Sequence, residues 1–264
     1  ALKVKGLINI QYVLAGGEIY VIEVNPRSSR TIPFMSKVTG VPMVELAMRV
    51  SLGEKIEDLG YGTGLLIEPT YSAVKAPVFS FGKMHQVEPS LGPEMKSTGE
   101  VMGIDFEYSN ALYKSLIGSG MKVPTQGKIL ITVADRDKQE ALVQALRYEA
   151  LGFTILATEG TAEFLWDNGV RSVMVVNKLS HSRPTILDLV QHGQIQLILN
   201  TLTKGKEPER DGFKIRRKAV ERNIPCFTAL DTSDAMLEVI EEMKERSLGY
   251  VLSIQDYLGR VRKG

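Results

Sequence analysis

The sequence predicts an α/β protein made of two domains, and three observations lead to this prediction. From residue 128 onward, apolar β-forming runs alternate with amphipathic helical runs, which is typical of a parallel sheet covered by helices on both faces. Residues 1–53 instead show a hairpin pattern followed by a helix. The chain of 264 residues is long enough for two domains that each bury a core.

The composition argues against several classes of protein. With 32 basic and 31 acidic residues the net charge is +1, so bulk electrostatics indicate neither a nucleic-acid partner nor a membrane surface. No apolar run approaches the roughly 20 residues of a membrane span, and no signal-peptide pattern opens the chain. The single cysteine, Cys226, cannot form an intrachain disulfide, and its apolar neighbours predict a buried strand thiol. We therefore expect a globular, cytoplasmic protein.

The first predicted domain, residues 1–125, opens with two β-rich runs at 6–14 and 18–24. Gly16 and Gly17 lie between these runs and permit the positive φ angles that a tight turn needs. The other expected features of this half are a helix at 41–53 ending on glycine, a strand at 76–81, a glycine-rich segment at 91–103, a short helix near 110–120 and a boundary rich in Pro and Gly at 121–128.

The second predicted domain, residues 126–264, has the alternating pattern. Strands are expected at 128–134, 153–158, 172–177, 195–200 and 224–230, and helices at 137–152, 161–169, 185–193, 211–223 and 232–247. Ligands of such open parallel sheets bind beyond the carboxyl ends of the strands. That edge is therefore where a site of this domain is expected.

A first candidate site lies in "VIEVNPRSSR", residues 21–30. Side chains alternate along a strand, so Glu23 and Asn25 share a face, and Gln11 on the partner strand is within a residue or two of lying across from them. One carboxylate and two amide oxygens, completed by phosphate oxygens, suit Mg²⁺, while Arg27 and Arg30 can hold an anion through forked hydrogen bonds. The short motif alone favours the alternative of a solvated edge hairpin.

A second candidate site consists of polar residues at the predicted strand ends of the second domain. The turn at 158–162 leads into a helix, whose free backbone N–H groups can cradle a phosphate. A capping threonine or a solvated lysine is the better interpretation of any one residue. The repeated placement at strand ends favours one shared pocket, made by Thr132, Lys138, Thr158, Thr161, Lys178, Asn200 and Thr203.

Two long stretches, residues 6–43 and 91–103, closely resemble the large subunit of carbamoyl phosphate synthase, and the resemblance runs through essentially the whole chain. The first part resembles the α+β carboxy-terminal lobe of the second, carbamate-phosphorylating ATP-grasp unit. The part from residue 126 resembles the methylglyoxal-synthase-like, flavodoxin-like α/β regulatory domain that closes the subunit. Because both ATP-grasp units carry the Glu-x-Asn-Pro-Arg motif, the following domain identifies which unit this is.

The resemblance implies the following roles. Gln11, Glu23 and Asn25 are metal ligands for Mg²⁺ or Mn²⁺, with Gln11 and Glu23 contacting ATP through the metal, and Arg27 and Arg30 are catalytic. The implied activity is ATP-dependent synthesis of carbamoyl phosphate from bicarbonate and glutamine-derived ammonia, for pyrimidine and arginine biosynthesis. A glutaminase small subunit is the implied partner. Since an ATP-grasp unit also needs an upstream lobe over the nucleotide, we expect a carboxy-terminal fragment that is inactive by itself.

The resemblance also implies that the strand-end residues bind a nucleotide or phosphoribosyl pyrophosphate effector, in a chain that can form homo-oligomers. Ala76 stands where ornithine-activated members carry an acid, which argues against ornithine. The basic residues Lys204, Lys206, Arg210, Arg216 and Arg217 suit a polyphosphate or, equally, form a solvated loop.

Two alternatives of other classes remain open. A lyase like methylglyoxal synthase needs an aspartate where Arg183 falls and a histidine after His192, and both are missing. His181 and His192 are therefore expected at the surface or at a helix end. An assembly module that docks on a glutaminase is the third hypothesis, but it leaves the strand-end pocket unexplained.

Overall fold

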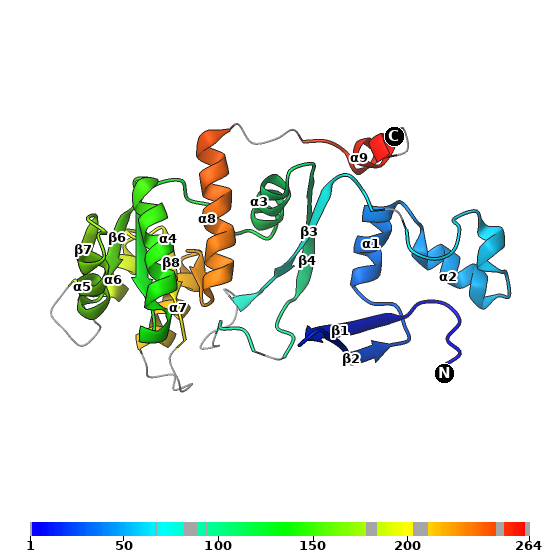
Figure 1. Ribbon diagram of the computed structural model, residues 1–264, viewed down its shortest axis with the longest axis horizontal. Coiled ribbons are helices and arrows are strands. Elements are labelled where there is room, and N and C mark those ends of the chain that lie inside the picture. Colours follow the sequence, from blue (N-terminus) through cyan, green and yellow to red (C-terminus); the bar gives the residue numbers. More distant parts are fainter. Residues whose placement is uncertain are drawn as a thin grey trace.

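The computed structural model describes residues 2–66, 68–81, 89–92, 94–177, 184–202, 211–246 and 251–261. Figure 1 shows the arrangement of its elements. In chain order they are β1 (Asn9–Ala15), β2 (Glu18–Asn25), α1 (Thr31–Thr39), α2 (Met43–Ser51), the 3-10 helix η1 (Ile56–Leu59), β3 (Ser72–Val78), β4 (Gly99–Asp105), α3 (Tyr108–Gly118), β5 (Lys128–Thr132), the 3-10 helix η3 (Asp135–Asp137), α4 (Lys138–Ala150), β6 (Thr154–Ala157), α5 (Glu159–Asp167), β7 (Val173–Val175), α6 (Ile186–Gln191), β8 (Leu197–Asn200), α7 (Asp211–Glu221), β9 (Cys226–Phe227), α8 (Leu230–Glu245) and α9 (Ile254–Val261).

The second half contains a five-stranded sheet in the order β7-β6-β5-β8-β9, with every neighbouring pair parallel. The predicted α/β class with a parallel sheet is therefore confirmed. Counted within this half, the strand order is 3-2-1-4-5, whereas flavodoxin has 2-1-3-4-5; both are doubly wound. The chain reverses direction across the sheet between β5 and β8, and this switch point is where such sheets bind ligands.

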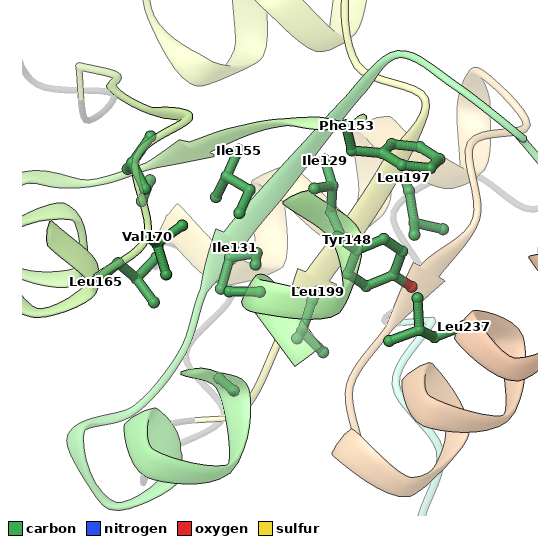
Figure 2. Packing of buried hydrophobic residues seen from close by; sticks show 14 of the residues in the cluster. Ile129, Ile131, Tyr148, Phe153, Ile155, Leu165, Val170, Leu197, Leu199 and Leu237 are labelled. Atoms are coloured by element: carbon green, nitrogen blue, oxygen red, sulfur yellow. The ribbon is translucent and has the colours of Figure 1, made fainter. Parts of the chain in front are cut away.

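The central strand β5 explains why the sheet needs helices on both faces. Ile129, Leu130 and Ile131 are all fully buried, and successive side chains of a strand point to opposite faces. Ile129 and Ile131 pack with Tyr148 of α4 and Leu237 of α8 (Figure 2). Leu130 belongs to a separate cluster on the other face, which α6 and α7 cover.

The first half has two small antiparallel sheets, β1-β2 and β3-β4. The β3-β4 pair packs against α3 at very short range: a Cβ added to Gly103 would lie 1.9 Å from the carbonyl oxygen of Ala111. β3 begins earlier than the expected strand at 76–81 and ends at Val78. The short helix expected near 110–120 is confirmed as α3.

The β1-β2 hairpin has the predicted glycine turn, with φ of 60° at Gly16 and 83° at Gly17. Most of its apolar side chains are exposed, including Leu14 at 73% and Ile19 at 69%. A two-stranded hairpin is marginal by itself, and exposed apolar patches mark interaction surfaces. The hairpin therefore presents an uncovered sheet face.

The end of the chain returns to the first half. The last helix that the sequence predicts is 232–247, but a further helix, α9, follows α8. Tyr257 of α9 is 1% exposed and shares a core cluster with Val38, Tyr71 and Ile104. The domain division near residue 125 stays a prediction, although α9 packs on the first half. Among the described residues, no helix is both long and apolar enough to cross a membrane.

Candidate functional site

The register of the β1-β2 hairpin brings the three predicted metal ligands together. Gln11 pairs directly with Glu23, and Asn9 pairs with Asn25. Paired residues of an antiparallel sheet share a face, so Gln11, Glu23 and Asn25 lie on one face. The register then shifts, because Tyr12 pairs with Val21. This β-bulge bends the strands just beyond the three ligands.

The loop after β2 carries the predicted arginines. Arg30 occupies the N-cap position of α1, and its Nη1 donates a hydrogen bond to the carbonyl oxygen of Ser97 at 3.4 Å. Ser97 belongs to the segment 91–103, so the two stretches that carry the family resemblance meet here. Arg27 donates from Nη1 to the carbonyl oxygen of Ser28 at 2.9 Å. Both arginine side chains are exposed and face solvent, where an anion can reach them.

Two further residues at this site were missed by sequence reasoning. Lys75 Nζ lies 3.2 Å from Thr31 Oγ1 at the start of α1 and 3.5 Å from a carboxylate oxygen of Glu100. It adds a cation beside Arg30. Ser29 Oγ is buried and has no hydrogen-bond partner among the described residues. Nothing in the sequence marks Lys75 as facing α1, because 44 residues separate it from Thr31.

The donor set fits a divalent cation only in part. Within the described ranges, no three His, Cys, Asp or Glu side chains gather as a metal-binding group. The hairpin face offers the Glu23 carboxylate and the amides of Gln11 and Asn25. Mg²⁺ keeps several waters and commonly takes one or two carboxylates together with substrate phosphates. The three residues therefore fit such an ion when phosphate oxygens complete its shell.

A second constellation lies at the switch point of the five-stranded sheet. Thr132 at the end of β5 pairs with Asn200 at the end of β8. Asn200 Nδ2 donates to Thr132 Oγ1 at 2.6 Å, and Arg216 Nη1 of α7 donates to Asn200 Oδ1 at 2.7 Å. Thr201 Oγ1 accepts from the backbone N–H of Ala134 at 2.9 Å. Thr132 and Asn200, two of the seven residues predicted to share one pocket, are in direct contact.

Lys138 at the start of α4 joins the turn that leads into α5. Its ammonium donates to the carbonyl oxygen of Gly160 at 3.0 Å and lies 2.8 Å from Asp135 Oδ1. The hydrogen bond from Lys138 lowers the pKa of Asp135 below its usual value. Thr158 holds the N-cap position of α5, but its hydroxyl makes no capping hydrogen bond, and Thr161 is 5% exposed. Lys138 and the Thr158–Thr161 turn thus adjoin each other.

Some expectations fall outside the described residues, and one is wrong. Lys178, Thr203, His181, Arg183, Lys204, Lys206 and Arg210 lie in segments outside the described ranges. The solvated-loop interpretation of Arg216 and Arg217 is wrong, because these side chains are 8% and 7% exposed. Arg216 binds Asn200, and Arg217 donates to the carbonyl oxygen of Phe81 at 3.0 Å and to Glu221 Oε1 at 3.1 Å. The α7 face that carries them packs inward.

His192 and Asp188 have structural roles at the two ends of α6. His192 ends α6, where its Nδ1 lies 2.7 Å from the carbonyl oxygen of Asp188, as a helix-end residue should. The Asp188 carboxylate accepts from both the N–H and the Oγ1 of Thr185 in a capping box.

Cys226 lies half-buried in β9. A hollow of about 610 Å³ between α3, α4 and α8 is lined by none of the predicted site residues.

Comparisons with known proteins define the class. Residues 1–59 match the family model "Carbamoyl-phosphate synthase L chain, ATP binding domain", and residues 140–228 match "MGS-like domain". The first match is to an ATP-binding domain of an ATP-dependent ligase family. In this order the two matches are those of the carboxy-terminal part of a carbamoyl phosphate synthase large subunit, and the resemblance found in the sequence is confirmed.

Two solved structures have a low similarity to the chain. Methylglyoxal synthase from Elizabethkingia anophelis NUHP1 is 18% identical, with a TM-score of 0.36, over 44% of this chain and 79% of that chain. The structure of ForH is 19% identical, with a TM-score of 0.34, over 52% of this chain and 90% of that chain. Neither likeness bears on the function of this chain.

Proposed function

We propose that the chain supplies one wall of the carbamate-phosphorylating site of a glutamine-hydrolysing carbamoyl phosphate synthase, together with the effector domain of that enzyme. The observation that carries this proposal is the direct pairing of Gln11 with Glu23, next to the loop from which Arg30 contacts Ser97. A carboxylate, amides and guanidiniums at one strand end match the needs of phosphoryl transfer, which depends on positioning and charge neutralisation.

The charges of the site residues indicate two different roles. Gln11, Glu23 and Asn25 would hold a divalent cation, Mg²⁺ or Mn²⁺, which when bound supplies positive charge to the phosphates of ATP. Arg27 and Arg30 present guanidiniums that neutralise an anionic substrate and the phosphoryl group as it moves. The hairpin face is exposed, so another part of the enzyme must cover it before water is excluded from the site. The chain by itself is therefore proposed to be inactive in synthesis.

The effector domain is proposed to bind a phosphorylated nucleotide or phosphoribosyl pyrophosphate at the sheet's switch point. Support comes from the contacts that join Thr132 to Asn200 and Lys138 to the turn at Gly160. The lyase alternative lacks support, because Arg183 stands where the lyase needs an aspartate and no histidine follows His192. A glutaminase subunit as partner, a role in pyrimidine and arginine biosynthesis and a cytoplasmic location complete the proposal.

A matched pair of substitutions in the synthetase that carries this chain tests the proposal. Glu23→Gln removes the only carboxylate of the ligand face and should abolish carbamoyl phosphate synthesis, while bicarbonate-dependent ATP hydrolysis at the other half persists. Glu18→Gln, an exposed acid on the same hairpin, is the control and should leave both activities unchanged. Near-normal synthesis in Glu23→Gln would remove Glu23 from the site.

A further inference from the structure

The carboxy-terminal helix α9 lies on the opposite side of β3 and β4 from the five-stranded sheet, beside α1 (Figure 1). Its Tyr257 ring lies 5.7 Å from the ring of Tyr71 and 5.3 Å from that of Phe106. Buried aromatic side chains dominate packing energetics, and edge-on ring pairs add to this. The helix is therefore anchored to the first half by an aromatic cluster in which Tyr71 and Tyr257 are buried.

A polar contact fixes the orientation of this anchor. Lys114 Nζ of α3 lies 3.1 Å from Tyr257 OH and 2.5 Å from Asp105 Oδ2 at the end of β4. A hydrogen bond from a charged donor is stronger and shorter than a neutral one. The Tyr257 hydroxyl of α9 thus contacts α3 directly through Lys114, and Lys114 links it to Asp105 of β4. These contacts give α9 a defined position.

The same helix also holds the carboxy-terminal end of α1. Gly40 caps α1 with φ of 70°, and a Cβ added to it would lie 3.2 Å from Leu258 Cδ2. The carbonyl oxygen of Val38, in the last turn of α1, accepts a hydrogen bond from the buried Tyr71 hydroxyl. Leu258 and the Tyr71–Tyr257 pair therefore enclose the final turn of α1.

The opposite end of α1 carries the candidate site. Arg30 is its N-cap residue, and only Ile32 and Val38 of the helix are buried. A nine-residue helix is about 13 Å long and behaves as a short rod. Because the buried residues of α1 are Ile32 near its start and Val38 near its end, a shift of its last turn would be transmitted along the helix to Arg30.

We propose that α9 is a positioning element for the phosphoryl-transfer site, in which Tyr257 and Leu258 hold α1 and thereby place Arg30. The inference rests on the proposed function, since it assumes that Arg30 works at that site. Because α9 follows α8 along the chain, the effector domain is covalently linked to the helix that contacts α1.

The first test uses the 264-residue chain alone. Hydrogen–deuterium exchange of peptides from α1 should become about tenfold faster or more in Leu258→Ala, because the cover of its last turn is lost. Peptides from β5 and β8 should exchange as before. The control is Gln255→Ala, an exposed position of α9, which should change nothing. Unchanged exchange of α1 in Leu258→Ala would overturn the proposal.

The second test separates positioning from general destabilisation, in the synthetase that carries this chain. Leu258→Ala should lower kcat for carbamoyl phosphate synthesis about tenfold or more, with KM for ATP unchanged, and Leu258→Met should restore it. Loss of synthesis in Arg30→Ala, with normal kcat in Leu258→Ala, would overturn the positioning role alone. Normal synthesis in both variants would reject the proposed function together with the inference.

Discussion

Asn200 at the end of β8 donates a hydrogen bond from Nδ2 to Thr132 Oγ1 at the end of β5, at 2.6 Å. The contact crosses the switch point of the sheet, where strands β5 and β8 lead to opposite sides. Arg216 Nη1 donates to the other end of the same amide at 2.7 Å. The orientation of the Asn200 amide is therefore set by two neighbours, one of which is a buried cation.

Arg216→Met should destabilise the protein and weaken its effector site. The Asn200 carbonyl would lose a charged donor while remaining buried, which costs roughly 1–3 kcal/mol in the free energy of unfolding. Affinity for uridine monophosphate should fall about tenfold, because Asn200 is no longer held toward Thr132. Urea denaturation and isothermal titration measure the two effects. Lys214→Met, at an exposed position of the same helix, should show neither, and identical behaviour of both variants would contradict the role of Arg216.

Lys138→Ala should weaken the binding of uridine monophosphate or phosphoribosyl pyrophosphate by about ten- to a hundredfold, since a charge-assisted hydrogen bond to phosphate is worth roughly 1.5–3 kcal/mol. Isothermal titration measures the affinities, and circular dichroism checks the fold. The informative partner is Asp135→Asn, which removes the carboxylate 2.8 Å from the ammonium and should bind at least as tightly as the wild type. Unchanged affinity in Lys138→Ala would place the effector elsewhere.

The sequence predicted the elements of the second half well because each β-rich run and each helical run is marked locally. It could not predict the inward position of Arg216 and Arg217, since "FKIRRKAVE" has the charge of a solvated helix. Their burial depends on Asn200 and on the Phe81 carbonyl, partners 16 and 136 residues away. Such partners appear only when the chain is folded.

The ligand hairpin was predictable to within a residue. Alternation placed Glu23 and Asn25 on one face, but the direct pairing of Gln11 with Glu23 depends on a bulge that leaves Ile22 unpaired. Nothing in the alternating pattern marks that bulge. α9 was missed for another reason: its short helical run is stabilised by the buried cluster around Tyr257 rather than by its own length.

Gly103→Ala should disrupt the packing of β4 on α3. The added Cβ would lie 1.9 Å from the Ala111 carbonyl oxygen and 2.6 Å from the Ser115 nitrogen. Both are backbone atoms of α3, so the helix must move, at a cost of several kcal/mol. Gly118→Ala is the matched control, because its nearest neighbour is Val101 Cβ at 3.6 Å, an ordinary contact. Thermal unfolding should show a large loss of Tm only for Gly103→Ala, and equal Tm values would refute the close approach.

The ion pair between Asp105 and Lys114 predicts a pH dependence of stability. Burial by itself would raise the pKa of Asp105, but hydrogen bonds from Lys114 and from the Glu107 backbone outweigh it, and the pKa lies below its usual value. A depressed carboxyl pKa contributes stability that is fully present above the unfolded-state value, about 3.9, and is lost as the pH falls through the folded value.

Urea denaturation of the wild type and of Asp105→Asn between pH 7 and pH 3 measures this contribution. At pH 7 the variant should be less stable by roughly 1–3 kcal/mol, because the Lys114 ammonium, 22% exposed, loses its charged partner. The difference should begin to shrink below about pH 4, where the unfolded-state carboxyl takes up a proton, and should continue to shrink as the pH falls through the lower folded-state pKa. Lys114→Met should remove the same pH-dependent part from the other side of the pair. A stability difference that stays constant across this range would show that the ion pair, and with it the polar hold on Tyr257, does not form as described.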